Sequence, residues 1–214
     1  MIALSPRTKA GRSGLVALLP KLHRERCILR LADLKVQRGT RKRAKHFELS
    51  VNTSLDAVVA GLRRQHGEDC WLYPPLVEGL RAIMAAPGAF DSDGGKGATT
   101  AAVRVHSFEV WDAASGALVA GELGYSVGLL YTSLSGFSEK NGAGSAQMAA
   151  TGALLASADA ELWDFGMVRK TAPPHATPSY YALKEEKEEK KKGRRRRRRR
   201  RKLWWVGSFK VSAR

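Results

Sequence analysis

The sequence predicts an α+β fold, in which an antiparallel meander of strands has flanking helices. Three observations lead to this class. Residues 103–111 (VRVHSFEVW) form the clearest strand-like run, and runs at 118–125 and 129–135 follow it after short turns. A glycine-rich loop at 141–144 then precedes an Ala-rich helix, and residues 161–167 predict one more strand. Consecutive strands followed by a helix are typical of α+β domains.

The first half of the chain adds strands and two helices. Strand-like residues lie between Cys27 and Val36, and apolar residues alternate with polar ones from Phe47 to Val51, which predicts a half-buried strand. The next helix can be capped by Thr53 or Ser54, and its apolar face comprises Leu55, Val58, Val59 and Leu62. A second helix begins at Pro74–Pro75, and its apolar stripe comprises Leu76, Leu80, Ile83 and Met84.

The second half of the chain completes the pattern. Residues 87–100 predict a flexible loop, and residues 112–116 predict the turn between the first two meander strands. We expect the Ala-rich helix from about Ser145 to Ala158. The order of meander, glycine loop, helix and strand resembles the core of the GNAT acyltransferases.

The 214 residues are enough for one ordinary domain. We expect residues 1–14 to be basic and disordered, residues 15–168 to form the domain, and residues 169–214 to be a linker and low-complexity basic tail. The folded pattern stops after Met167, so the fold is expected to be incomplete at its C-terminus. We interpret the Lys/Arg tract at 184–202 as a simple-sequence run rather than a nucleic-acid-binding or nuclear-entry signal.

Charge and cysteine content narrow the class of partner. The formal net charge is +17, and the tract at 184–202 contributes +10, so the rest of the chain is still basic and favours a polyanion such as RNA. Cys27 and Cys70 form neither a metal-ligand spacing nor a disulfide framework. No apolar run approaches the roughly 20 residues of a membrane helix. We expect a cytoplasmic protein, with an organelle as the alternative because the first 24 residues contain no acid.

The most specific motif is residues 106–111 (HSFEVW), which resembles the HSxEVW signature of leucyl/phenylalanyl-tRNA–protein transferases. Other blocks resemble that family in the same order. They are Trp71 before a helix, LVAGELG at 118–124, SGF at 135–137, LWD at 162–164, and the upstream segments at 34–36 and 41–43. The resemblance covers roughly residues 18–168.

The resemblance implies an aminoacyltransferase. Such an enzyme takes leucine or phenylalanine from aminoacyl-tRNA and joins it to an acceptor protein whose first residue is Lys or Arg, which marks the acceptor for degradation. The aminoacyl ester already stores the free energy, so no metal or nucleotide cofactor is needed, and aminoacyl-tRNA is a co-substrate. We expect the protein to be a monomer.

Two carboxylates are the predicted catalytic residues. Asp164 matches the family's aspartate at a strand end, whose implied role is to orient the reacting groups through hydrogen bonds. The sequence departs from the family at Leu134, where a glutamate is expected, and at Gly166, where a glutamine is expected. We therefore hypothesise that Glu122, with Glu109 on the adjacent strand, supplies acid to the site or binds a basic N-terminus.

The predicted binding residues form two sets. Trp71, Tyr131, Leu134 and Ser135 are expected to bind substrate, with Tyr131 and Leu134 together lining an apolar pocket and a core role as the alternative for Trp71. The tRNA-binding set is a cluster of cations that would neutralise phosphates: Arg38, Arg41, Lys42, Arg43 and Lys45. The alternative for this cluster is a solvated charged surface.

A glycine loop supports a rival function. Gly142, Gly144 and Ser145 open the Ala-rich helix, where backbone N–H groups can bind an anion. The spacing nearly copies the loop that binds the coenzyme A pyrophosphate in GNAT acetyltransferases, although Glu139 replaces the expected Gln or Arg. The alternatives are thus an acetyl-CoA-dependent acetyltransferase and a non-catalytic RNA-binding domain, and a plain turn explains the loop equally well.

Overall fold

The computed structural model describes residues 25–85 and 103–167, together with four short strands nearer the N-terminus. These are β1 (Ile2–Leu4), β2 (Arg7–Thr8), β3 (Gly11–Arg12) and β4 (Ala17–Leu19), with β1 paired to β4 and β2 to β3. The predicted loop at 87–100 and the tail at 169–214 lie outside the described residues. The domain limits therefore stay predictions.

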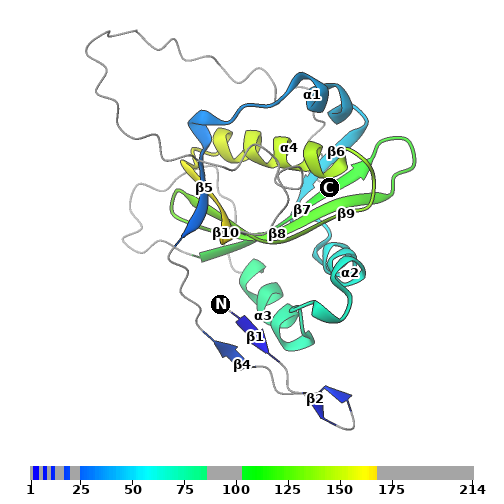
Figure 1. Cartoon of the computed structure of the whole chain (residues 1–214), viewed down its shortest axis with the longest axis vertical. Helices are drawn as coiled ribbons and strands as arrows, with labels where there is room; N and C mark the ends of the chain where they lie inside the picture. Colours follow the sequence, from blue (N-terminus) through cyan, green and yellow to red (C-terminus); the bar gives the residue numbers. More distant parts are fainter. Residues whose placement is uncertain are drawn as a thin grey trace, which may run out of the picture.

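A six-stranded sheet forms the centre of the domain (Figure 1). Its spatial order is β5-β10-β9-β8-β7-β6, and neighbours are antiparallel except β9 and β10, which are parallel. The bounds are β5 (Arg26–Arg30), β6 (Phe47–Val51), β7 (Val103–Asp112), β8 (Leu118–Val127), β9 (Leu130–Ser138) and β10 (Leu162–Met167). The α+β class and the meander β7-β8-β9 are confirmed.

Helices cover both faces of the sheet (Figure 1). On one side α4 (Ala143–Ser157) packs on the sheet, and α1 (Arg38–Ala44) packs on α4; this side is called the α4 face. On the other, called the α2 face, lie α2 (Leu55–His66) and α3 (Pro74–Met84). Two single 3-10 turns complete the described helices: η1 (Leu31–Asp33) and η2 (Gly67–Asp69).

Packing on the α4 face is close because α4 is rich in small residues. A Cβ on Gly152 would lie only 2.7 Å from Leu34 Cδ2 and 3.0 Å from Trp163 Cζ3. Below α4, aromatic rings meet edge to face, with centroids 5.5 Å apart for Phe108 and Tyr131 and 6.0 Å apart for Tyr131 and Trp163. This aromatic layer fixes β7, β9 and β10 relative to one another.

Packing on the α2 face depends on a helical glycine. A Cβ on Gly61 would lie 2.4 Å from the Phe137 ring, so only glycine lets α2 approach β9 this closely. Val58, Leu62 and Leu123 are fully buried around the same contact. The helix predicted from the apolar face at 55–62 is therefore confirmed, with Ser54 as its N-cap residue.

The strand-like residues predicted between Cys27 and Val36 are confirmed as β5, which gives way at Leu31 to the η1 turn, and this turn buries Leu31 in the core of the α4 face. The apolar stripe predicted for the second helix needs correction. The second helix begins at Pro74 as predicted, but its buried residue is Val77, and Ile83 is 41% exposed. Two adjacent apolar residues at 76 and 77 leave the helix rotation ambiguous by about 100° per residue.

Candidate functional site

Asp164 lies on β10 with only 4% of its surface exposed. Its Oδ2 accepts a 2.6 Å hydrogen bond from Arg26 Nε of β5, and its Oδ1 accepts the Gly166 backbone N–H at 2.8 Å. Gly166 has φ +88°, and the β10–β5 register shifts between Asp164 and Met167. A side chain at 166 would be strained in this conformation. The bulge that turns the Gly166 N–H onto Asp164 thus explains the glycine found where the family resemblance leads one to expect glutamine.

The parallel pairing of β9 and β10 ends at Asp164. The last paired residue on β9 is Thr132, although β9 continues to Ser138 and β10 to Met167. Beyond this pair, no residue of β9 is a cross-strand partner of a residue of β10. The hydroxyl of Thr132 is buried, with 3% of the residue exposed, and has no hydrogen-bond partner among the described residues.

Three of the predicted substrate-binding residues lie on the α2 face. Trp71 and Leu134 are partly buried against the same apolar cluster, which also contains Leu123 and Phe137. Ser135 Oγ lies 3.2 Å from His66 Nε2 at the end of α2. Asp164 belongs to this face too, because side chains alternate along β10 and its neighbour Trp163 points to the α4 face. The structure therefore places these three residues on the same face of the sheet as Asp164.

Glu122 lies on the opposite face of the sheet from Asp164. It is 3% exposed, and its carboxylate accepts hydrogen bonds from Tyr131 Oη at 2.9 Å, Gln147 Nε2 at 2.6 Å and Ser133 Oγ. Burial raises the pKa of Glu122, and the three donors oppose that rise. Ser133 Oγ in turn accepts the Trp163 indole N–H at 2.8 Å. The carboxylate thus ties α4, β8, β9 and β10 together from beneath α4.

Tyr131 does not line a common pocket with Leu134, contrary to the expectation from the sequence. It is fully buried on the α4 face, whereas Leu134 packs on the α2 face. Burial, followed by the neighbouring Glu122, raises the pKa of Tyr131 well above its usual value. Residues 131 and 134 are three positions apart on β9, so the ordinary alternation of side chains along a strand already points them to opposite faces.

Glu109 does not cooperate with Glu122, because the two carboxylates point to opposite faces. Glu122 pairs with Phe108 rather than Glu109 in the β7–β8 register. The Glu109 carboxylate instead accepts hydrogen bonds at the start of α2, from Ser107 Oγ at 2.6 Å, Ser50 Oγ at 2.7 Å, Thr53 Oγ1 at 2.9 Å and the Ser54 N–H at 3.2 Å. The Trp111 indole donates to Ser50 Oγ at 2.8 Å. The HSFEVW motif therefore builds a buried anchor for α2.

His106, the first residue of that motif, is a buried imidazole on the α4 face. Its ring nitrogens lie 2.9 Å from Ser126 Oγ and 3.5 Å from Asn52 Nδ2. Burial, with a smaller contribution from Arg104, lowers the pKa of His106 to about 4. It is therefore neutral at pH 7, and its contacts are those of a packed strand residue.

The five predicted tRNA-binding cations all lie on or next to α1 and are exposed: Arg38, Arg41, Lys42, Arg43 and Lys45. Thr40 and Ala44, four residues apart, are the buried residues of α1. This spacing turns one face of the helix inward, and the cations occupy the remainder.

The predicted anion loop lies against α1. A Cβ on Gly142, which has φ +83°, would meet Arg43 Cδ at 2.8 Å. Two N–H groups of the loop already have partners within the chain, because Ala143 donates to Lys140 O and Gly144 donates to Ser138 Oγ. Ser145 is exposed at the start of α4, and Glu139 is paired with Arg64 of α2 at 2.7 Å. The N–H groups of Ala143 and Gly144 are therefore not available to an anion.

The comparison with known families decides the identity of this fold. A sequence model described as leucyl/phenylalanyl-tRNA protein transferase matches residues 28–173, well over half of the chain. The chain belongs to the leucyl/phenylalanyl-tRNA protein transferase family. None of the curated proteins matches the sequence.

The transferase family match contains all of the site residues predicted from the sequence. Asp164, Glu122, Trp71, Leu134 and the α1 cations fall inside residues 28–173, whereas Arg26 lies just before this range. The ion pair between Arg26 and Asp164 could not be predicted from the sequence, because it joins residues 138 positions apart. The hydroxyls of Thr132 and Ser133 were not predicted either. The sequence signal for them is the adjacent pair of hydroxyl residues between Tyr131 and Leu134 in the strand-like run.

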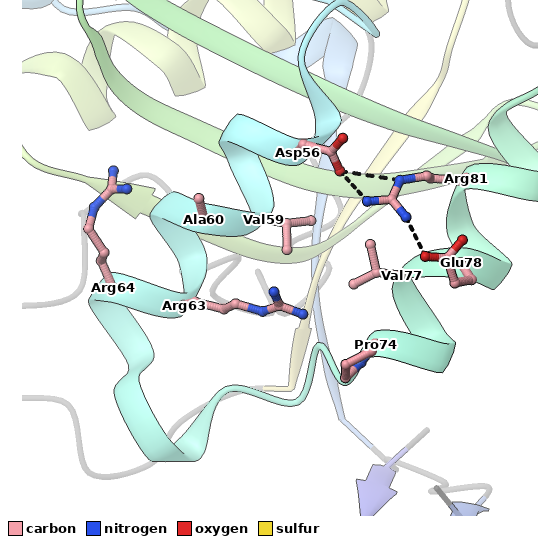
Figure 2. Close-up of a pocket in the computed structure, with 9 residues that line it drawn as sticks. All are labelled: Asp56, Val59, Ala60, Arg63, Arg64, Pro74, Val77, Glu78 and Arg81. Carbon is pink, nitrogen blue, oxygen red and sulfur yellow. Dashed lines mark hydrogen bonds and ion pairs between the residues drawn. The ribbon is translucent and has the colours of Figure 1, made fainter. Parts of the chain in front are cut away.

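An open groove between α2 and α3 is separate from these transferase residues (Figure 2). It has a volume of about 520 Å³ and an apolar floor that includes Val59, Ala60 and Val77. At its rim, Arg81 makes ion pairs with Asp56 at 2.5 Å and Glu78 at 2.6 Å. None of the predicted site residues lines the groove.

The described part of this transferase offers neither a metal cluster nor a membrane helix. No group of three or more His, Cys, Asp or Glu side chains is close enough to hold a metal ion among the described residues. In the same part of the chain, every helix is too short or too polar to cross a membrane. The expectation that no cofactor is needed stays a prediction.

Proposed function

We propose that this protein transfers leucine or phenylalanine from aminoacyl-tRNA to the N-terminal Lys or Arg of an acceptor protein, which marks the acceptor for degradation. The observation that carries the proposal is Asp164. A buried carboxylate held by Arg26 and Gly166, at the point where β9 and β10 stop pairing, provides a fixed acceptor for the N–H groups of a substrate.

The reaction forms one bond and breaks one. The acceptor's α-amino nitrogen attacks the ester carbonyl carbon, the C–N bond forms, and the C–O bond to the tRNA ribose breaks. One proton passes from the amine to the departing ribose oxygen. The ester supplies the free energy, so we propose that no metal or nucleotide takes part.

The Arg26 guanidinium gives this carboxylate a second property. Arg26 carries a positive charge, and 35% of its side-chain surface is exposed beside the buried Asp164. The Asp164 carboxylate on its own would favour a protonated amine, and the paired Arg26 cation offsets this effect and so favours the neutral, nucleophilic form. Asp164 then orients the amine through hydrogen bonds while Arg26 keeps it reactive.

Trp71 and Leu134 are the proposed walls for the transferred side chain. Both are partly buried in one apolar cluster on the face of Asp164, which suits leucine or phenylalanine better than a polar side chain. Ser135, next to Leu134, contacts His66 and borders the same region. Leu134 thus contributes apolar surface where the family resemblance suggests a carboxylate.

Glu122 and Tyr131 are proposed to position the site rather than to touch substrate. The chain of hydrogen bonds from Glu122 through Ser133 to the Trp163 indole ends one residue before Asp164. Glu122→Gln keeps the shape of the side chain but removes the negative charge. Unchanged transfer by this variant would remove Glu122 from the proposal.

The proposed tRNA-binding surface is α1. Its exposed cations can neutralise backbone phosphates without reading sequence, and such contacts supply much of the affinity of proteins for nucleic acids. Because α1 packs outside α4 while Asp164 lies on the α2 face, the aminoacylated end of the tRNA must reach around the sheet. A single-stranded 3′ end is suited to such a path. We propose a monomer working in the cytoplasm, with an organelle as the alternative.

A direct assay tests the proposal. The full chain is incubated with radiolabelled leucyl- or phenylalanyl-tRNA and a peptide that begins with arginine, and labelled peptide is the readout. We expect transfer by the wild type, a loss of about a hundredfold in kcat/KM for Asp164→Asn, and no change for Asp159→Asn, an exposed aspartate after α4. The proposal fails if the wild type transfers nothing, or if both variants behave alike.

The same assay separates the rival functions. Acetyl-CoA turnover without tRNA would favour the acetyltransferase, and tRNA binding without turnover would favour a non-catalytic RNA-binding domain. The Gly144 N–H, bound to Ser138 Oγ at 3.0 Å, argues against a coenzyme A loop, because that N–H is no longer available to a pyrophosphate.

A further inference from the structure

Thr132 has a buried hydroxyl with unused hydrogen-bonding capacity. The residue is 3% exposed, and Oγ1 has no partner among the described residues. A buried hydroxyl without a partner costs about 1–3 kcal/mol, so folded proteins rarely keep one without a reason. Thr151 on α4 is the other described residue with this property and provides a natural comparison.

The β9–β10 register places Thr132 directly beside Asp164. These two residues are cross-strand partners, and the preceding pair is Tyr131 with Trp163. The Tyr131 and Trp163 rings meet on the α4 face with centroids 6.0 Å apart. Because side chains alternate along a strand, Thr132 and Asp164 both point to the α2 face, on backbones about 4.8 Å apart.

The pair lies at the end of the parallel ladder. Beyond Thr132 and Asp164, no residue of β9 pairs with a residue of β10, although both strands continue. A hydroxyl oxygen and a carboxylate therefore lie on neighbouring strands where the β9–β10 pairing ends. Arg26, with 35% of its side chain exposed, connects this position to the surface.

We infer that Thr132 Oγ1 and the Asp164 carboxylate together bind the α-amino group of the acceptor. This inference rests on the proposed function and deepens it, because it adds a residue that contacts the attacking nitrogen. The amine has more than one N–H, so Thr132 Oγ1 accepts one and Asp164 accepts another. Each Asp164 oxygen already has one donor, and a carboxylate oxygen can accept a second.

Two fixed hydrogen-bond acceptors set the orientation of the amine, whereas a single acceptor leaves the amine free to rotate. With two of its N–H bonds held, the amine directs its lone pair toward the ester carbon. When the C–N bond forms, one proton goes to the ribose oxygen as the C–O bond breaks, and Thr132 gains or loses no proton. Thr132 therefore contacts and orients the nucleophile, and bonds form and break only in the two substrates.

The test uses a substitution that removes the hydroxyl and keeps the shape. Thr132→Val is compared with Thr132→Ser, which restores a hydroxyl, and with Thr151→Val as the matched control. Binding of an Arg-initiated peptide with a free amine, and of its N-acetylated form, is measured by calorimetry without tRNA. Transfer and thermal unfolding are measured on the same proteins.

We expect Thr132→Val to bind the free-amine peptide about tenfold more weakly, to raise the acceptor KM, and to leave the KM for aminoacyl-tRNA unchanged. Its melting temperature should be equal to or above that of the wild type, because a buried unpaired hydroxyl has been removed. Thr132→Ser should recover most of the affinity. Thr151→Val should bind and transfer like the wild type, and N-acetylated peptide should bind poorly to all four proteins.

The outcomes separate this inference from the proposed function. Normal transfer and peptide binding by Thr132→Val would overturn the inference and leave the function standing. Hydroxyl-dependent binding of the free amine without any transfer would support the inference while the function fails. A wild type that does not distinguish the free amine from the acetylated peptide would overturn the inference as well.

Discussion

The carboxylate of Glu109 accepts the backbone N–H of Ser54, the N-cap residue of α2, at 3.2 Å. The side chain of Ser54 itself makes no capping hydrogen bond to the helix. A residue of the neighbouring strand β7 therefore supplies the negative charge that the N-terminal end of α2 favours. The same carboxylate collects three hydroxyl donors, so one side chain joins β6, β7 and α2.

This anchor predicts a large stability loss when it is removed. Glu109 is fully buried, and Glu109→Ala leaves three hydroxyl donors and a backbone N–H without this acceptor, so we expect the free energy of unfolding to fall by about 3 kcal/mol. Urea unfolding followed by circular dichroism measures it. Glu161→Ala, an exposed glutamate, is the control and should change stability by less than about 0.5 kcal/mol. Equal effects of the two changes would contradict the anchor.

Two helical glycines predict opposite effects of the same substitution. Gly61→Ala should destabilise by more than about 2 kcal/mol, because the new Cβ would meet the Phe137 ring at 2.4 Å. Gly79→Ala on α3 meets nothing within 4 Å, so it should stabilise by about 0.5–1 kcal/mol through the lower entropy of the unfolded chain. Thermal unfolding of both variants checks the pair. A neutral Gly61→Ala would mean that α2 does not sit this close to β9.

Buried His106 predicts an acid-dependent loss of stability. Its pKa is about 4 in the folded protein against an ordinary value of 6.5, so the unfolded chain binds its proton first as the pH falls. The favourable effect of neutral His106 is complete above pH 6.5 and declines toward pH 4, by roughly 3 kcal/mol in total. His106→Gln should lack this part of the pH dependence. His46→Gln, an exposed control, should retain it, and parallel curves for wild type and His106→Gln would refute the assignment.

The α1 surface predicts a salt-dependent effect on tRNA affinity. Replacing Arg38, Arg41 and Lys42 by Gln should weaken binding and reduce the slope of log K against log salt by about 2 to 3, since each lost phosphate contact contributes up to about 0.9. Fluorescence anisotropy over a range of salt concentrations measures the slope. Arg81→Gln, which removes a cation already paired with Asp56 and Glu78, should leave the slope unchanged. An unchanged slope in the triple variant would leave α1 as a solvated charged surface.

Local patterns predicted most of the fold, because the meander and the helices follow from short-range signals. The strands at 103–111, 118–125 and 129–135 and the helix near Ser145 agree with β7, β8, β9 and α4 to within a few residues. The face of the sheet to which each strand side chain points was harder to predict. A register shift in β8–β9 and the pairing of Glu122 with Phe108 decide which side chains meet, and neither leaves a trace in the sequence.

The sequence predicted residues of the candidate site only where they belong to a motif of the family. Asp164 came from the family resemblance, but its partner Arg26 and its neighbour Thr132 depend on pairings across 138 and 32 positions. Glu122 was chosen as an acid beside substrate, whereas the structure gives it three donors beneath α4. A polar residue on a strand can contact substrate on one face of the sheet or accept buried hydrogen bonds on the other, and only tertiary contacts show which role it has.

Strand β10 lies between β9 and β5, the first strand of the sheet, and this order affects how the protein is made on the ribosome. Residues 26–30 emerge early, yet their partner strand at 162–167 is translated last among the described elements. Until then β5 has no neighbour in the sheet, and Asp164 cannot meet Arg26. A nascent chain that stalls before β10 therefore carries an unpaired strand and no complete site, which makes it a substrate for chaperones rather than an active enzyme.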